Sequence, residues 1–227
     1  MKTQLLALAL LAPLAVAQDR QDYSPAERLL FMSDQLAGID PPATLRYAFR
    51  KTGALEAGFE DRVSIVLEKQ ADGSCCRASG QFLSGARKVA LPAIDDAKAN
   101  PVTMYFLEHD VRDMQRLTRG QPNHFRKRIR MAIYNESRVE DVSASYRGQT
   151  IAARSVRIAP YANDTSRHRF ARHADKSYVF VVSPHVPGTV VGVRSVIAGA
   201  PGEPPLIAEE LLLEGASLPT EPGPAAR

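Results

Sequence analysis

The sequence predicts an α+β fold in which helices cover one face of a large, curved antiparallel sheet that resembles half a barrel. Apolar and polar residues alternate through most of the chain, which is the pattern of strands that bury one face. Apolar residues recur at helical spacing in only two places, near the N-terminus and in a central segment, residues 101–134. These observations indicate an N-terminal helix and a helical hairpin inserted into the sheet.

The first seventeen residues have the pattern of a cleavable secretory signal. Lys2 supplies a positive charge, Leu5 to Leu14 form an apolar run, and residues 15–17 place small side chains where a signal peptidase cuts. The run is shorter than the about 20 residues of a membrane-spanning helix, and no later run is longer. We therefore expect cleavage before Gln18 and a periplasmic or secreted protein with no transmembrane segment.

The rest of the chain suits one α+β domain over residues 18–216, followed by a tail rich in Pro and Ala, residues 217–227, that we expect to be disordered. The formal charge of the full sequence is +4, and cleavage removes Lys2 alone among charged residues, which leaves +3. A weak positive charge on an exported protein argues against nucleic acid as a partner.

The N-terminal helix is predicted from Pro25 to Ala37. Ser24 is a favourable N-cap, proline suits the first helical position, and Glu27 completes a capping box. Gly38 suits the C-terminal cap. One face of this helix carries apolar side chains at Leu29, Met32 and Leu36.

Strand periodicity occurs in two blocks. The first, residues 44–90, includes the alternating series Leu45, Tyr47 and Phe49 and a hairpin turn at residues 71–73. The second follows Glu136, with a turn at residues 147–149. Its candidate strands are Val142–Tyr146, Thr150–Ile158, Arg169–Ala171, Ser177–Val182, Thr189–Ala198 and Leu206–Leu213.

The helical hairpin is predicted from Pro101 to Tyr134, with its turn at Gly120. Cations gather around this turn and form a candidate anion or partner site: Arg112, Arg116, Arg119, Arg126, Arg128 and Arg130. Arginine binds carboxylates and phosphates through paired hydrogen bonds. The alternative is a solvated helix surface with internal ion pairs, such as Glu108 with Arg112.

The two cysteines, Cys75 and Cys76, are adjacent in the sequence. They are a candidate redox pair, because export permits disulfides. The alternative is two thiols on opposite faces of a strand.

The hairpin also carries acidic and histidine side chains, but their spacing indicates no catalytic or metal site. His109 and Asp113 share a helical face, whereas Glu108 and Asp110 each point about 100° away from His109. The sequence contains no HExxH motif, nucleophile elbow, P-loop or dinucleotide fingerprint. We expect no catalytic residue, no metal and no cofactor.

A resemblance to the signature region of uncharacterised exported proteins of proteobacteria is carried by NPVTMYFLEHDVRDMQRLTRG and the FRKRIR that follows it. The order of signal, helix, long antiparallel sheet and helical insertion resembles the LolA-like periplasmic lipoprotein carriers. In that family a curved, incomplete barrel shields acyl chains under helices.

The second resemblance is one of topology, and it implies a periplasmic binding or carrier protein for an apolar or amphipathic ligand such as a lipid, with the hairpin as a lid. Two alternatives stay open. One is an envelope assembly factor that binds another envelope protein through the same arginines. The other is a thiol–disulfide enzyme that uses Cys75 and Cys76.

Overall fold

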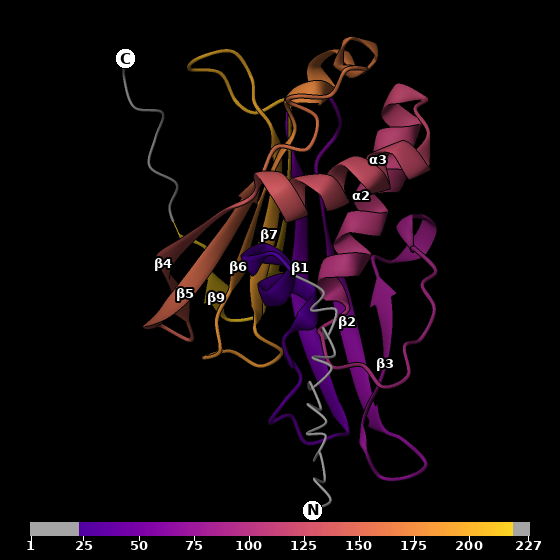
Figure 1. Ribbon diagram of the computed structural model, residues 1–227, viewed down its shortest axis with the longest axis vertical. Helices are drawn as coiled ribbons and strands as arrows, with labels where there is room; N and C mark the ends of the chain where they lie inside the picture. The colour runs from indigo at the N-terminus through magenta and orange to yellow at the C-terminus, as the bar shows by residue number, and fades with distance from the viewer. Residues whose placement is uncertain (1–22, 220–227) are drawn as a thin grey trace, which may run out of the picture.

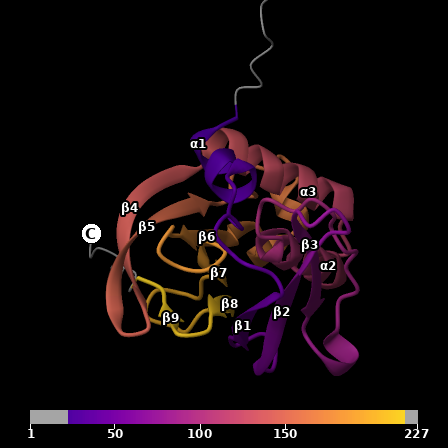
Figure 2. The ribbon, with the colours of Figure 1, turned by 90° about the horizontal axis from the view of Figure 1, so that it is seen from below.

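The computed structural model describes residues 23–219, so the predicted secretory signal lies outside the described residues. Within this range one nine-stranded antiparallel sheet forms the body of the molecule, in the order β3-β2-β1-β8-β7-β6-β5-β4-β9. The helices lie on one side of it (Figure 1), and the view in Figure 2 shows how strongly the sheet curves around that side. The predicted α+β class with an open, curved sheet is confirmed.

The strands come in two sequence blocks that meet in the middle of the sheet. Phe49 on β1 pairs with Leu211 on β8, so the C-terminal part of the chain joins the N-terminal block to the rest. The first block consists of β1 (Ala43–Thr52), β2 (Phe59–Lys69) and β3 (Cys75–Phe82). The second consists of β4 (Arg138–Tyr146), β5 (Gln149–Ile158), β6 (Ser177–Val182), β7 (Val190–Ile197), β8 (Ile207–Leu213) and β9 (Ala216–Ser217).

The N-terminal helix is shorter than predicted. It comprises α1 (Pro25–Glu27) and a π-helical turn, η1 (Arg28–Met32), and Ser33 then adopts extended dihedral angles. The side-chain amide of Gln35 donates to the carbonyl of Leu29 at 2.7 Å, a group that continuing the helix would have satisfied. The prediction that the helix extends to Ala37 is therefore wrong.

The helical hairpin is confirmed as α2 (Val102–Thr118) and α3 (Pro122–Met131), with α3 continuing into a π-helical turn, η3 (Ala132–Glu136). The residue that ends α2 in the left-handed backbone conformation is Arg119, with φ of 58°, and not Gly120. Gly120 is needed for a different reason, because a Cβ there would lie 2.4 Å from the Phe125 ring. The glycine thus lets the two helices approach closely.

The predicted strand over residues 169–171 is wrong, because this region forms two short 3₁₀ turns, η4 (Arg167–Arg169) and η5 (Ala171–Asp175). A third such turn, η2 (Gly85–Arg87), follows β3. The apolar residue between η4 and η5, Phe170, packs against Phe125 of α3 with ring centroids 5.3 Å apart. Contact with the hairpin, and not strand pairing, therefore explains why Phe170 is buried.

The folded part extends slightly past residue 216. Ser217 pairs with Ser145 at the edge of the sheet, and Leu218 packs against the core. Residues 220–227, which make up most of the predicted tail, lie outside the described residues.

Candidate functional site

A row of polar side chains crosses the helix-covered face of the sheet. Lys51 on β1 pairs with Glu209 on β8, Glu209 pairs with Ser195 on β7, and Ser195 pairs with Tyr178 on β6. All four residues are buried. Each takes a position that strand alternation assigns to the core. At these four positions, polar side chains therefore stand where apolar side chains would be expected.

Helix α2 covers this row and adds three ionisable residues to it. Asp110 forms an ion pair with Lys176, which precedes β6, and accepts a hydrogen bond of 2.5 Å from the Tyr178 hydroxyl. His109 and Asp113, one helical turn apart, lie nearer the other end of the row. The result is a continuous network of buried charges between the helix and the sheet.

The Lys51 ammonium is surrounded by three carboxylates. Its Nζ lies 2.7 Å from Asp113 Oδ2, 2.8 Å from Glu56 Oε2 and 3.1 Å from Glu209 Oε1. Burial alone would lower the pKa of this amine, but the charges of Glu209 and Asp113 outweigh burial and raise it above its usual value. Lys51 is therefore a permanent cation at neutral pH.

The neighbouring carboxylate of Glu209 is held in its ionised form by the same network. Burial favours the neutral acid, but the positive charge of Lys176, together with His109 and Lys51, lowers the pKa of Glu209 below its usual value. Paired charges of this kind make burial tolerable, whereas an unpaired charge would be very costly.

A polar cleft of about 530 Å³ opens onto this end of the network. Arg116 lines the cleft and donates hydrogen bonds of 2.7 and 3.0 Å to the two oxygens of Glu56. We define the polar cleft by its lining residues: Lys51, Glu56, Ala57, Phe59, Leu83, Ala86, Arg87, Lys88, Val89, His109, Arg112, Asp113 and Arg116. Two carboxylates of the network, Glu56 and Asp113, line it directly, whereas Glu209 lies below it and is fully buried.

A second cavity, the apolar groove, lies on the opposite side of α2 and has a volume of about 320 Å³. It runs between the N-terminal helical turn, α2, α3 and η3. Its lining residues are Glu27, Phe31, Met104, Leu107, Glu108, Val111, Arg126, Ile129, Arg130 and Ile133. Six of the ten are apolar and four are charged.

The charged residues at the apolar groove differ in their partners. Arg126 binds Glu108 through two hydrogen bonds of 3.0 and 2.8 Å. Glu27 caps the N-terminal helix by accepting from the Ser24 backbone at 2.8 Å. Arg130 is exposed and forms no ion pair within residues 23–219. It is therefore the cation at this groove that is free to meet a ligand.

The six arginines that the sequence suggests as one anion site belong to different places. Arg112 and Arg116 line the polar cleft, whereas Arg126 and Arg130 line the apolar groove. Arg119 borders a small pocket of about 180 Å³ beside the hairpin turn. Arg128 turns inward and donates to the Pro160 carbonyl at 2.9 Å. Binding of an anion by any of them stays a prediction.

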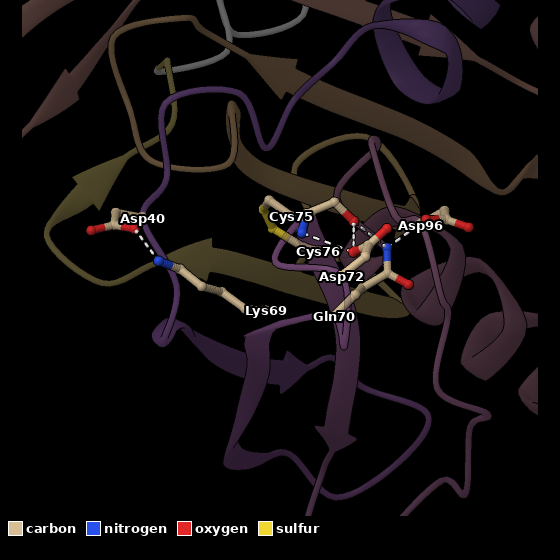
Figure 3. The surroundings of a disulfide bond; sticks show 8 residues. Asp40, Lys69, Gln70, Asp72, Cys75, Cys76 and Asp96 are labelled. Carbon is tan, nitrogen blue, oxygen red and sulfur yellow. Dashed lines mark hydrogen bonds and ion pairs between the residues drawn. A yellow bond between two sulfur atoms is a disulfide. The ribbon is translucent and has the colours of Figure 1, made fainter.

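The candidate redox pair lies at the start of β3, just after the turn that follows β2 (Figure 3). The structure joins Cys75 and Cys76 in a disulfide, with Cys75 exposed and Cys76 buried. The nearby cations are directed at carboxylates, Lys69 at Asp40 (3.4 Å; Figure 3) and Arg77 at Asp95 (3.2 Å). Redox activity of this pair stays a prediction.

Sequence reasoning missed the residues that the sheet contributes to the network. Lys51 extends the inward series of Leu45, Tyr47 and Phe49, and Glu209 falls between the inward residues Ile207 and Leu211. A charge on the apolar face of a strand is the signal that could have found them.

No family model matches this chain, and a search of curated proteins finds no match either. Among solved structures, the crystal structure of the lipoprotein LppX from Mycobacterium tuberculosis is similar to it with a TM-score of 0.33 and 8% sequence identity. The match covers 79% of this chain and 89% of that chain. A similarity of this size carries no argument about function, and the resemblance to LolA-like carriers stays a prediction.

Within residues 23–219, no helix has both the length and the apolar character needed to cross a bilayer.

Proposed function

We propose that this protein binds a small amphipathic molecule in the apolar groove, and that it does so in the periplasm or outside the cell. The observation that supports the proposal is the groove itself, a mostly apolar surface between helices whose lining includes a free cation, the exposed Arg130. Ligand sites are typically concave and mostly apolar, with a few polar groups that orient the ligand.

The size and charge of the groove favour one class of occupant. A volume of about 320 Å³ is at the lower end of the roughly 300–1,000 Å³ that ligand pockets occupy. It suits a single apolar chain better than a multi-chain lipid. Arg130 would pair with an anionic head group, because guanidinium binds carboxylate and phosphate well. The proposed ligand is therefore a single-chain anionic amphiphile.

The helical hairpin supplies most of the wall of this groove. Met104 and Leu107 come from α2 and Ile129 from α3, and Phe31 of the N-terminal turn faces them. The groove therefore lies among helices, and the sheet contributes none of its lining residues. In this proposal the ligand separates the N-terminal turn from the hairpin, and the hairpin acts as a wall and not as a lid over the sheet.

The test is a fluorescence titration of the mature protein, starting at Gln18, with a fluorescent single-chain fatty acid. Met104 is 47% exposed, so Met104→Glu should spare the fold while introducing a charge into the groove. We expect this variant to weaken binding at least about tenfold. Val66→Glu is the matched control, since Val66 is 36% exposed on β2 away from the groove.

Equal binding by the wild type and Met104→Glu, or no saturable binding at all, would contradict the proposal. So would a concentration-dependent dimer that Met104→Glu abolishes, because the groove would then be a contact between two copies. The head-group assignment has its own test. Arg130→Gln should weaken binding of the fatty acid but not of the matching neutral alcohol.

A further inference from the structure

Three side chains from α2 and β8 bring potential metal ligands together at the floor of the polar cleft. One ligand atom each from His109, Asp113 and Glu209 lie within 4.8 Å of one another. His109 and Asp113 are one turn apart on α2, and Glu209 sits in the centre of the sheet. Regular elements hold all three, which is the rigid support that a metal site requires.

One buried ligand atom in this group, His109 Nε2, lacks a hydrogen-bond partner within the described residues. It stands 3.6 Å from Glu209 Oε1, too far for a hydrogen bond, and Glu209 Oε1 itself is paired with the Lys51 ammonium 3.1 Å away. His109 is 8% exposed and lines the polar cleft, and Glu209 is fully buried. Two ligands of one tetrahedral zinc ion, each about 2.1 Å from the metal, would be about 3.4 Å apart.

The position of Lys51 shows that this place stabilises a cation. Its ammonium bridges Asp113 Oδ2 at 2.7 Å and Glu209 Oε1 at 3.1 Å, which are two of the three candidate ligands. It also contacts Glu56, 2.8 Å away on the cleft wall. The flexible side chain of Lys51 can keep Glu56 while a metal ion takes its place between the other two carboxylates.

The donor atoms select the class of ion. Imidazole together with carboxylates suits zinc and neighbouring transition metals, whereas magnesium and calcium prefer oxygen ligands alone. Three protein ligands leave a coordination position open, as in zinc sites that also bind water or a substrate. The cleft of about 530 Å³ provides the entry path.

We propose that His109, Asp113 and Glu209 bind one divalent transition-metal ion, such as zinc, in competition with the ammonium of Lys51. This site is separate from the apolar groove and does not depend on the ligand proposed there. Binding would exchange an internal cation for an external one and leave Lys51 paired with Glu56.

The test is calorimetric titration of the untagged, metal-free protein with zinc chloride, in buffer without reductant so that Cys75 and Cys76 provide no thiols. We expect saturation at one equivalent. His109→Gln and Asp113→Asn should each weaken binding at least about tenfold. Lys51→Met should strengthen it, since the competing ammonium is removed.

His124→Gln is the matched control, because His124 pairs with Asp164 at 2.6 Å in a different part of the fold. It should bind zinc as the wild type does. Circular dichroism of each variant establishes that the fold is kept.

If His109→Gln binds like the wild type, the site is elsewhere. If only Lys51→Met binds zinc, Lys51 is the permanent occupant. Equal affinity for magnesium and zinc would contradict the assignment of the site to transition-metal ions. Each of these results refutes the proposal.

Discussion

The two faces of α2 border cavities of opposite character. Met104, Leu107 and Val111 face the apolar groove, whereas His109 and Asp113 face the polar cleft. The difference arises from what covers each face. Helices pack beside the first face, while the second meets a row of polar side chains on the sheet. One helix can therefore border two different cavities when its periodicity separates apolar from ionisable residues.

The two regions also differ in how they depend on the rest of the fold. The apolar groove is bordered by a short N-terminal turn and two helices, so its shape follows from local packing. The polar cleft rests on charges that are paired across β1, β8 and α2, so losing one partner leaves another uncompensated in the core. We therefore expect mutations in the network to affect stability more than mutations at the groove.

The largest expected effect comes from Lys176→Met. Lys176 is 2% exposed and pairs with Asp110, and its Nζ is 3.8 Å from Glu209. Removing it leaves the buried carboxylate of Asp110 without a cation, which should lower the free energy of unfolding by about 3–5 kcal/mol. Urea denaturation measures this change.

The control for that prediction is Arg50→Met, which breaks an exposed pair with Glu60 at 4.0 Å. It should cost less than about 1 kcal/mol. If both variants lose the same stability, the buried network has no special role.

A smaller effect is expected at the capping box that holds the N-terminal wall of the groove. Ser24 Oγ accepts a hydrogen bond of 3.2 Å from the Glu27 backbone. Ser24→Ala should cost about 1 kcal/mol of stability and weaken amphiphile binding, because Glu27 and Phe31 line the groove. Zinc binding should be unchanged. A matching loss of zinc affinity would mean that the two cavities are coupled.

The smallest effect concerns acid stability at the polar cleft. Arg116, and then Lys51, lower the pKa of Glu56 from 4.5 to about 2. A carboxyl with a lowered folded-state pKa stabilises the fold above the unfolded value and loses this contribution as the pH falls from about 4.5 to 2. Glu56 is partly exposed, so solvent screening should keep the contribution under about 1 kcal/mol.

Unfolding measured across this pH range should therefore be less pH-dependent in Glu56→Gln than in the wild type. Glu60→Gln, which removes an exposed carboxylate, is the control and should keep the wild-type profile. Identical profiles for all three proteins would show that Glu56 contributes nothing to acid stability.

Local patterns predicted most of the secondary structure, because they depend on neighbours in the chain. The hairpin of α2 and α3 and the alternation in β1 were readable in this way. The predictions were wrong where contacts of a side chain with another part of the fold decided the local structure. The Gln35 side chain donates to a carbonyl at the end of the shortened N-terminal helix, in place of a further helical turn. Phe170 is buried by contact with α3, although no strand forms there.

The candidate sites were less predictable than the fold. Helical spacing placed His109 and Asp113 on one face, but it gave no reason to connect them with Glu209, nearly a hundred residues later. The arginines, close together in sequence, face different cavities because their helices point them in different directions. Proximity in sequence predicts proximity in space only within an element.

The sequence by itself determined the α+β class, the inserted hairpin and the side of β1 that turns inward, because hydrophobic periodicity is a local property. Only the tertiary structure decided that β8 lies between β1 and β7. That strand order places Glu209 opposite Lys51 and under His109. The physical reason is that strand register and long-range pairing depend on the packing of the whole sheet, which no short segment encodes.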